Sequence, residues 1–348
     1  MKRVAIIGYG VMGEWHVEQI LKGKAVDLAG IYDIDPKMIE KAQSNNIHTY
    51  ASLEELLADE SVEIVTIATP NQLHKPLAIK ALNAGKNVIS EKPVTLCCED
   101  LQDIIDVANK CGKLFTVHQN RRFDGEFIMI KDLYDSGALG DVFGLRTSLY
   151  GSHGIPGDWR ATKACGGGML YDWGVHLIDQ MLYLVGDLKI KSVYCQFENI
   201  TNDEVDDGFK LDIRFENGMV GRIEVGTNHF ISLPMFYMTG TNGTALVQTW
   251  RSNCKVVACT NWEPGELIPI ITSAGVTRTM APRNADTITE YEIPRVKHDV
   301  HDFYRNFIKA IDGEEDQFVT HAQMMRAIKV IEVAFKSAEI DAPVEYED

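Results

Sequence analysis

The chain has 348 residues, 45% hydrophobic and 24% charged. This composition excludes global disorder and fibrous folds, and at about 150 residues per domain it predicts two domains. The 34 basic and 50 acidic residues give a formal net charge of −16. A surface this acidic repels phosphate backbones and anionic lipid headgroups, so neither nucleic acid nor a membrane surface is an expected partner.

No targeting segment or metal site is predicted. Residues 4–7 are too short an apolar run for a secretory signal, and no run reaches the roughly 18 apolar residues that a bilayer span needs. We therefore expect a cytoplasmic protein. The seven cysteines form no C-x-x-C framework, which argues against a disulfide scaffold or a zinc site. The ligand spacing is poor even in the nearest candidate set, Cys254, Cys259, His298 and His301.

The first 120 residues alternate short buried strands with helical patterns. Helices are predicted from Asp35-Pro36 onward, over 77–84 and over 101–111. The predicted strands cover residues 4–7, 28–32, 63–68, 87–90 and 114–118. This alternation predicts a Rossmann-type, doubly wound parallel sheet over residues 1–120, in an α/β protein.

Residues 121–348 carry strand after strand instead. Two closing helices are predicted near 300–312 and 321–337. The predicted strands cover 142–149, 192–198, 208–215, 219–226, 235–239, 244–249 and 254–259. This succession of strands predicts an α+β domain with a large, mainly antiparallel open sheet.

One hairpin of this sheet has a predictable register. A three-residue loop ending at Gly218 pairs Phe215 with Met219 and Leu211 with Ile223, which keeps the apolar side chains on one face. A two-residue turn would mix the faces, so we predict the longer loop with Gly218 in a left-handed conformation.

A glycine-rich motif follows the first strand. Gly8, Gly10 and Gly13 form G-x-G-x-x-G, in which the glycines allow a tight turn, a close approach to a pyrophosphate and close helix packing. The amides of Val11 and Met12 would point at the anion from the helix N-terminus. A lone motif is weak, but the strand–turn–helix context favours a dinucleotide site over a bare turn.

Asp33 ends the second strand, 20 residues after Gly13. A carboxylate there accepts hydrogen bonds from ribose hydroxyls and repels a 2′-phosphate. The next residue is Ile34 rather than an arginine. We therefore predict NAD, with NADP disfavoured.

Lys92 and one later helix carry candidate chemistry. Lys92 stands at the carboxyl end of the fourth strand, where ligands bind in such sheets, although a solvent-exposed lysine is an alternative. A helix over 169–185 places Asp172, His176 and Asp179 on one stripe. A carboxylate beside an imidazole can orient a general base, or can form a purely structural hydrogen bond. The pattern alone leaves both open.

Taken together and in their order along the chain, the motifs of this sequence resemble those of the Gfo/Idh/MocA family of sugar and polyol oxidoreductases. The resemblance extends over nearly the whole chain. The motifs that carry the resemblance are Gly8–Gly13, Asp33, Ala68-Thr69-Pro70-Asn71 with His74, Glu91-Lys92-Pro93, Asn120-Arg121-Arg122-Phe123, Asp158-Trp159-Arg160, Gly166-Gly167-Gly168 and Asp172-x-x-x-His176.

The resemblance implies a role for each motif. Lys92 would lie between nicotinamide and substrate, before a proline that is often cis, with Asp172 as orienter and His176 as general base. Trp173 and the 151–154 segment depart from the family pattern, so substrate contacts are expected from Tyr150, His153 and Trp173 beside Lys92, Asp172 and His176. The remaining cofactor contacts would come from Thr69, Asn71, His74, Glu91, Asn120, Trp159 and Arg160.

These observations predict an NAD-dependent oxidoreductase that transfers a hydride from a cyclic polyol, sugar or glycoside. Family resemblance also implies a homodimer or homotetramer assembled through the second-domain sheet. A glycoside-processing enzyme with transient or 3-position sugar oxidation is an alternative, and so is a non-catalytic dinucleotide sensor. The joint presence of Lys92, Asp172 and His176 argues against the sensor.

Overall fold

Five parallel strands form the first sheet, in the order β2-β1-β3-β4-β5. The structure is a computed structural model that describes residues 1–263, 267–297 and 299–347. The strand bounds are β1 Arg3–Ile7, β2 Asp27–Tyr32, β3 Ile64–Ile67, β4 Asn87–Ser90 and β5 Phe115–Val117. Every residue of β3, β4 and β5 is buried, as continuous apolar runs in a covered parallel sheet predict. The predicted Rossmann-type domain is confirmed.

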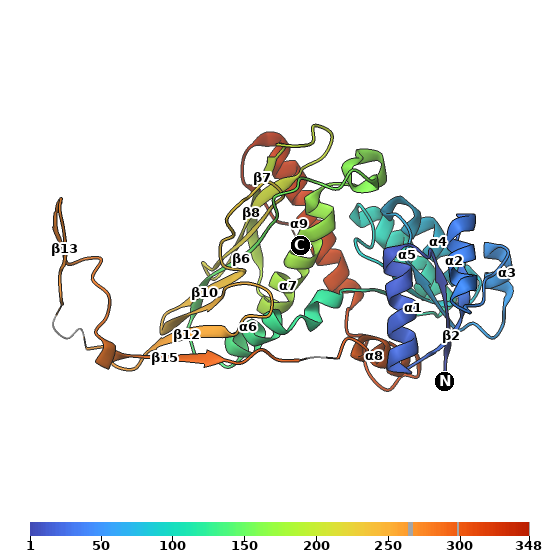
Figure 1. Cartoon of the computed structure of the whole chain (residues 1–348), viewed down its shortest axis with the longest axis horizontal. Coiled ribbons are helices and arrows are strands. Elements are labelled where there is room, and N and C mark those ends of the chain that lie inside the picture. Colours follow the sequence, from blue (N-terminus) through green and yellow to red (C-terminus); the bar gives the residue numbers. More distant parts are fainter. Residues whose placement is uncertain (264–266, 298, 348) are drawn as a thin grey trace.

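Helices α1–α5 accompany this sheet (Figure 1). Their bounds are α1 Val11–Gly23, α2 Pro36–Ser44, α3 Leu53–Ala58, α4 His74–Asn83 and α5 Cys98–Cys111. The start of α2 follows from its sequence, because the Asp35 side chain accepts the Lys37 amide at 2.9 Å and Pro36 fills the first turn. Helix α3 was not predicted, because a capped turn and a half has too few residues to show a period.

The second sheet has nine strands, in the order β15-β12-β11-β10-β6-β9-β8-β7-β16. Its neighbours pair antiparallel except for β6 and β9, which are parallel, so the mainly antiparallel prediction is confirmed. The bounds are β6 Val142–Tyr150, β7 Ile190–Glu198, β8 Gly208–Phe215, β9 Val220–Gly226, β10 Phe236–Gly240, β11 Gly243–Val247, β12 Cys254–Cys259, β15 Ile288–Ile293 and β16 Val344–Glu345.

The predicted β8–β9 register is confirmed. Leu211 lies opposite Ile223, and the Phe215 amide donates to the Met219 carbonyl at 2.9 Å. Gly218 has φ +88°, the left-handed conformation that the three-residue loop requires. Strand β15 was not predicted, because its Thr and Glu side chains leave an edge strand with little apolar pattern.

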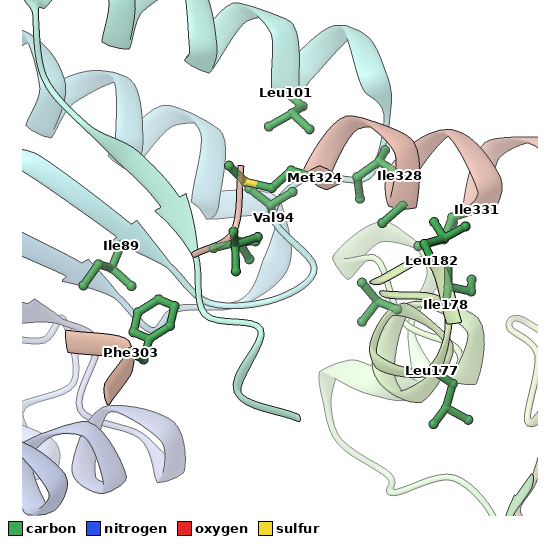
Figure 2. Packing of buried hydrophobic residues seen from close by; sticks show 14 of the residues in the cluster. Ile89, Val94, Leu101, Leu177, Ile178, Leu182, Phe303, Met324, Ile328 and Ile331 are labelled. Atoms are coloured by element: carbon green, nitrogen blue, oxygen red, sulfur yellow. The ribbon is translucent and has the colours of Figure 1, made fainter. Parts of the chain in front are cut away.

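Helices α7 and α9 lie along one face of the nine-stranded sheet, between it and the first domain (Figure 1). The second-domain helices are α6 Gly125–Asp135, α7 Val175–Val185 and α9 His321–Ile340. Helix α6 was not predicted, and it begins at a glycine without a side-chain cap. In Figure 2, Ile331 of α9 packs toward Ile178 and Leu182 of α7, while Met324 reaches Val94 after β4. Helix α9 therefore joins the Lys92 loop to the helix that carries His176.

The predicted helix over 169–185 is regular only in its second part. Residues Leu170–Gly174 form one π turn, in which the Val175 amide reaches back five residues to the Leu170 carbonyl. Gly174 permits this close packing, because a Cβ there would stand 2.9 Å from both Leu170 and Phe209.

A late helix returns to the first domain. Helix α8, Asp302–Ile311, was predicted as part of the second domain, but its Tyr304 hydroxyl lies 2.8 Å from His16 Nδ1 of α1. Phe303 reaches the region of Ile89 on β4 (Figure 2), and Lys2 pairs with Asp312 at 2.9 Å. Helix α8 therefore packs on the first domain although it follows the predicted boundary at residue 120, and no local sequence pattern indicates this contact.

The two faces of the nine-stranded sheet differ. Gly221 faces α7, since a Cβ there would contact Met181. The opposite face, called here the open face, carries a row of paired residues across successive strands: Tyr194, Asp212, Arg222, Arg146 and Tyr237.

Among the helices described, none is both long and apolar enough to cross a bilayer.

Candidate active site

Backbone geometry shapes the loop between β1 and α1. Gly8 has φ +94°, and a Cβ on Gly13 would stand 1.9 Å from the Gly8 carbonyl oxygen. Gly10 faces open space, since a Cβ there would have no neighbouring atom within 4 Å. Gly10 caps α1 without a side chain, so the first amides, including those of Val11 and Met12, are free to bind an anion. The loop fits a dinucleotide pyrophosphate.

Asp33 is held at the rim of this loop by two backbone amides. Its Oδ2 accepts from Tyr9 at 2.6 Å and its Oδ1 from Asp35 at 2.8 Å. These hydrogen bonds fix the carboxylate at the carboxyl end of β2, beside the glycine loop. That is the position from which a carboxylate binds ribose hydroxyls in this fold.

The residues after β3 mainly connect protein loops. The Asn71 side chain donates to the Gly166 carbonyl at 2.9 Å. His74 is buried with its ring nitrogens 2.8 Å from the Pro93 carbonyl oxygen and 2.9 Å from that of Thr69. Burial lowers the pKa of His74. Asn71 and His74, which were predicted to contact the cofactor, therefore hold neighbouring loops in position.

Lys92 and Asp172 form the centre of the site. Lys92 Nζ donates to the Asp172 carboxylate at 2.8 Å and to its carbonyl at 2.9 Å, and Arg160 Nε lies 3.5 Å from the other carboxylate oxygen. Burial acts to raise the pKa of Asp172, but Lys92 and Arg160 hold it below its usual value. The Lys92–Pro93 peptide is cis, as the resemblance implied.

His176 stands beside this pair without joining it. It is only 5% exposed, and its Nδ1 has no hydrogen-bond partner in the described part of the chain. Burial, with Lys92 and Arg121 adding to it, holds the pKa of His176 well below its usual value. The carboxylate of Asp172, which was predicted to orient His176, contacts Lys92 and Arg160. Asp179, predicted on the same stripe, forms a buried pair with Arg122.

The triple glycine lets two loops touch. The Gly168 amide donates to the Arg160 carbonyl at 2.9 Å, and a Cβ on Gly167 would stand 2.2 Å from that same oxygen. Asp158 caps the short turn that carries Trp159 and Arg160. The turn thereby brings the Arg160 guanidinium over the Trp159 ring and within reach of Asp172.

Glu91 points into the protein. It accepts from His16 Nε2 at 2.8 Å and from His118 Nδ1 at 2.9 Å, while its other oxygen lies 3.2 Å from the Lys92 amide. Burial works to raise the pKa of Glu91, but the two histidines hold it well below its usual value. These three side chains could hold a metal by type and proximity, since their donor atoms lie within 4.8 Å of one another. As hydrogen-bonded, they anchor the residue before Lys92.

The predicted substrate residues separate into two groups. Trp173 lies 5.9 Å from the His176 ring and stacks on the Arg121 guanidinium at 4.5 Å. Tyr150 instead points to the open face, where its hydroxyl bonds to Glu224 and its ring stacks on His229. His153 is exposed in the loop after β6. The structure thus brings Trp173 to the centre, but neither Tyr150 nor His153.

The remaining residues at or near the site include some that were predicted from the sequence and some that were not. Asn120 ends the loop after β5, and its Oδ1 is buried without a partner among the described residues. The side chain of Thr69 is in the same state. Of the residues weighed as metal ligands, His298 lies outside the described residues. Sequence patterns did not single out the neighbours His16, His118, Trp250 and Tyr304.

Two family models match the chain in succession. The "Oxidoreductase family, NAD-binding Rossmann fold" covers residues 2–119, and the "GFO/IDH/MocA C-terminal domain" covers residues 127–246. The chain belongs to the Gfo/Idh/MocA family. The resemblance drawn from its motifs is confirmed, and with it an NAD-binding Rossmann domain in an oxidoreductase.

Individual proteins agree with this assignment. An uncharacterized oxidoreductase of Schizosaccharomyces pombe is 30% identical over 323 residues, 86% of either chain. The scyllo-inositol 2-dehydrogenase (NADP(+)) IolW of Bacillus subtilis is 32% identical over 206 residues, 57% of this chain and 56% of its own. An NAD-binding protein from Listeria innocua has a solved structure that matches with a TM-score of 0.95 and 42% identity over 99% of both chains.

Proposed function

We propose that this Gfo/Idh/MocA oxidoreductase is an NAD-preferring dehydrogenase that oxidises a hydroxyl carbon of a cyclic polyol, sugar or glycoside. One observation carries the proposal: Lys92 Nζ is held 2.8 Å from Asp172 at the carboxyl edge of the first sheet, next to the buried His176. Ligands bind at this edge in doubly wound sheets. The similarity to a scyllo-inositol 2-dehydrogenase supports the substrate class.

Each residue has a distinct part in the proposed reaction. Bound NAD supplies the hydride acceptor. The Lys92 ammonium stabilises negative charge on the reacting oxygen, an effect worth about 2.7–4 kcal/mol per donor. His176, held neutral by its lowered pKa, accepts the hydroxyl proton. Asp172 positions Lys92, and Arg160 holds the second oxygen of Asp172.

Cofactor preference is assigned to Asp33. Two amides hold its carboxylate at the end of β2, where it would repel a 2′-phosphate. The Bacillus subtilis relative IolW is a scyllo-inositol 2-dehydrogenase (NADP(+)), but its similarity covers only 57% of this chain. We therefore infer the NAD preference from Asp33 itself.

The test is a turnover screen with purified protein, NAD or NADP, and a panel of inositols, aldoses and glycosides, read at the NADH absorbance. Stoichiometric NADH with at least one cyclic substrate is expected, and none with any of them would contradict the proposal. On that substrate, His176→Asn should lower kcat and kcat/KM together by about 10²–10⁴-fold. His48→Asn, at an exposed histidine, is the matched control.

A further inference from the structure

Two tryptophans, Trp173 and Trp250, form an aromatic wall beside the candidate active site. Trp173 lies in the π turn after Asp172, and Trp250 lies in the turn between β11 and β12. The two ring centroids are 6.4 Å apart, with their planes at 50°. Trp173 also lies 5.9 Å from the ring of His176, so the wall begins next to the proposed base.

Arg121 holds the two rings together from one side. Its guanidinium carbon lies 4.5 Å from the centre of the Trp173 ring and 5.1 Å from that of Trp250, close enough for a cation–π attraction to both. Arg121 donates to Asp124 at 3.2 Å, and its carbonyl accepts from the Gln180 side chain at 2.7 Å. Protein contacts therefore fix the wall on this side and leave its other side for a ligand.

Exposure increases along the wall. His176 is 5% exposed, Trp173 is half-buried and Trp250 is 40% exposed. Aromatic side chains line many small-molecule sites, because a rigid ring supplies a large contact area at a small entropic cost. The wall thus leads from the buried base to solvent and keeps an indole surface available there.

The turn that carries Trp250 has an unfavourable backbone conformation. The Ser252 amide donates to the Thr249 carbonyl at 3.1 Å, which closes a four-residue turn with Trp250 at its second position. Arg251, at the third position, has φ +66°, in the left-handed region that arginine seldom adopts. Such strain persists only where surrounding contacts enforce it, and it is frequent at ligand sites.

A buried carboxylate supplies the enforcing contact. Glu126, in the first turn of α6, is 1% exposed and accepts the Arg251 amide at 2.6 Å. Its Oε1 also accepts from Arg295 Nε at 2.6 Å, which compensates the buried charge. Helix α6 lies beside β12 (Figure 1), so Glu126 reaches the turn that precedes this strand. The direction of Trp250 is therefore fixed by the fold.

The wall has the chemistry to bind a second ring attached to the reacting one. One face of a pyranose carries mainly C–H groups, and an aromatic aglycone is flat and apolar, so either packs against an indole. A ring that presents its hydroxyl to His176 lies beside Trp173, and Trp250 follows at a spacing of 6.4 Å, on the scale of one further ring. A free polyol would leave Trp250 in water.

We propose that Trp250 stacks on the second ring of a glycoside, and that the substrate is a glycoside in preference to a free polyol or sugar. The role of Trp250 rests on the function proposed above, because the reacting ring is the one placed at Lys92 and His176. It extends that function by assigning the ring that does not react to a residue outside the proton and hydride transfers.

Binding to the NADH-loaded protein tests this role without requiring turnover. Calorimetric titrations use methyl and phenyl glycosides of glucose, galactose and mannose in both anomers, together with maltose, cellobiose and lactose. Where a methyl glycoside binds, its phenyl counterpart or the matching disaccharide should bind about tenfold more tightly, as one ring packed on an indole predicts. The phenyl and disaccharide arms distinguish an aromatic aglycone from a second sugar.

Trp250→Ala should remove this gain and leave the affinity for methyl glycosides unchanged, which also shows that the variant is folded. Trp250→Phe should keep most of the gain. Trp262→Ala is the matched control, since Trp262 is 60% exposed and lies under the Arg283 guanidinium at 4.7 Å, but beyond the opposite end of β12.

Equal affinities for one-ring and two-ring ligands, a gain that survives Trp250→Ala, or no binding of any glycoside would overturn the role of Trp250. Turnover with NAD separates this failure from that of the proposed function. Oxidation of an inositol or aldose without preference for a second ring would support the dehydrogenase and refute the stacking. Binding that depends on Trp250 without NADH formation from any substrate would support the stacking and refute the dehydrogenase.

Discussion

The two ends of the candidate active site are held in position by different means. At the Gly8–Gly13 loop, backbone contacts set the shape, since a single added carbon at Gly13 would overlap the Gly8 carbonyl. At the Lys92 corner, charged side chains from distant segments set it, through Asp172, Arg160 and the buried Glu91. Substitutions at the loop should therefore act on binding and folding, whereas those at the corner should act on turnover.

The largest expected effect is on catalysis at the corner. Lys92→Met should lower kcat/KM by about 10²–10³-fold, since a neutral side chain cannot stabilise charge on the reacting oxygen. If Asp172 acts by positioning Lys92, adding Asp172→Asn to Lys92→Met should cost little more. A further large loss in the double variant would mean that Asp172 acts independently of Lys92. Lys80→Met, at an exposed lysine on α4, should retain wild-type turnover.

The next effect is a pH dependence of stability that comes from buried histidines at the Lys92 corner. His16 and His176 have lowered pKa values in the folded protein, with burial as the main cause. Below about pH 6.5 the unfolded chain binds protons at these residues and the folded chain does not. The free energy of unfolding should therefore fall as the pH falls, by nearly 1.4 kcal/mol per histidine per pH unit. Urea unfolding at pH 7.5, 6.5 and 5.5 measures this slope. The slope in His176→Asn should be smaller by one histidine's share, and an unchanged slope would argue against a buried neutral His176.

Two glycines of the loop should respond differently. Gly13→Ala should lower the free energy of unfolding by about 1–3 kcal/mol, because its Cβ overlaps backbone. Gly10→Ala places its Cβ in open space, so stability should be retained while NADH affinity falls. Urea unfolding and NADH fluorescence titration on the same samples measure both. Equal losses of stability in the two variants would contradict the difference in packing.

The smallest effect concerns cofactor choice. Asp33→Asn should lower the ratio of kcat/KM for NAD over NADP by about tenfold, the equivalent of one charge interaction of about 1.4 kcal/mol. Asp35→Asn is the matched control, since Asp35 caps α2 and should not change the ratio. If Asp33→Asn leaves the ratio of kcat/KM for NAD over NADP unchanged, another residue discriminates between the two cofactors.

The predictable parts of the molecule were those fixed by local rules. The glycine spacing predicted the β1–α1 loop, the alternation of Phe215 and Met219 with their neighbours predicted the β8–β9 register, and strand-end logic predicted Lys92. That same logic would have found His118, which follows β5 at the same edge. Each of these features depends on a few consecutive residues.

Other parts of the site depend on contacts between segments that are far apart in the sequence, and the spacing of residues along one helix cannot predict such contacts. Asp172 contacts Lys92, a contact that the helical spacing did not predict, and the β6 alternation, applied to Tyr150, would have placed that residue on the open face. Tyr304 reaches His16 across 288 positions of sequence, so no spacing rule connects them. These interactions require the second domain to be in place.

The return of α8 has a consequence for synthesis of the protein. Phe303 and Tyr304 are nearly fully buried, and Tyr304 contacts the first domain near its N-terminus. A ribosome adding about 5–20 residues per second reaches them on the order of ten seconds or more after residue 119. For that interval the nascent first domain exposes the surface that these side chains later cover, which is the period in which a chaperone would have most to bind.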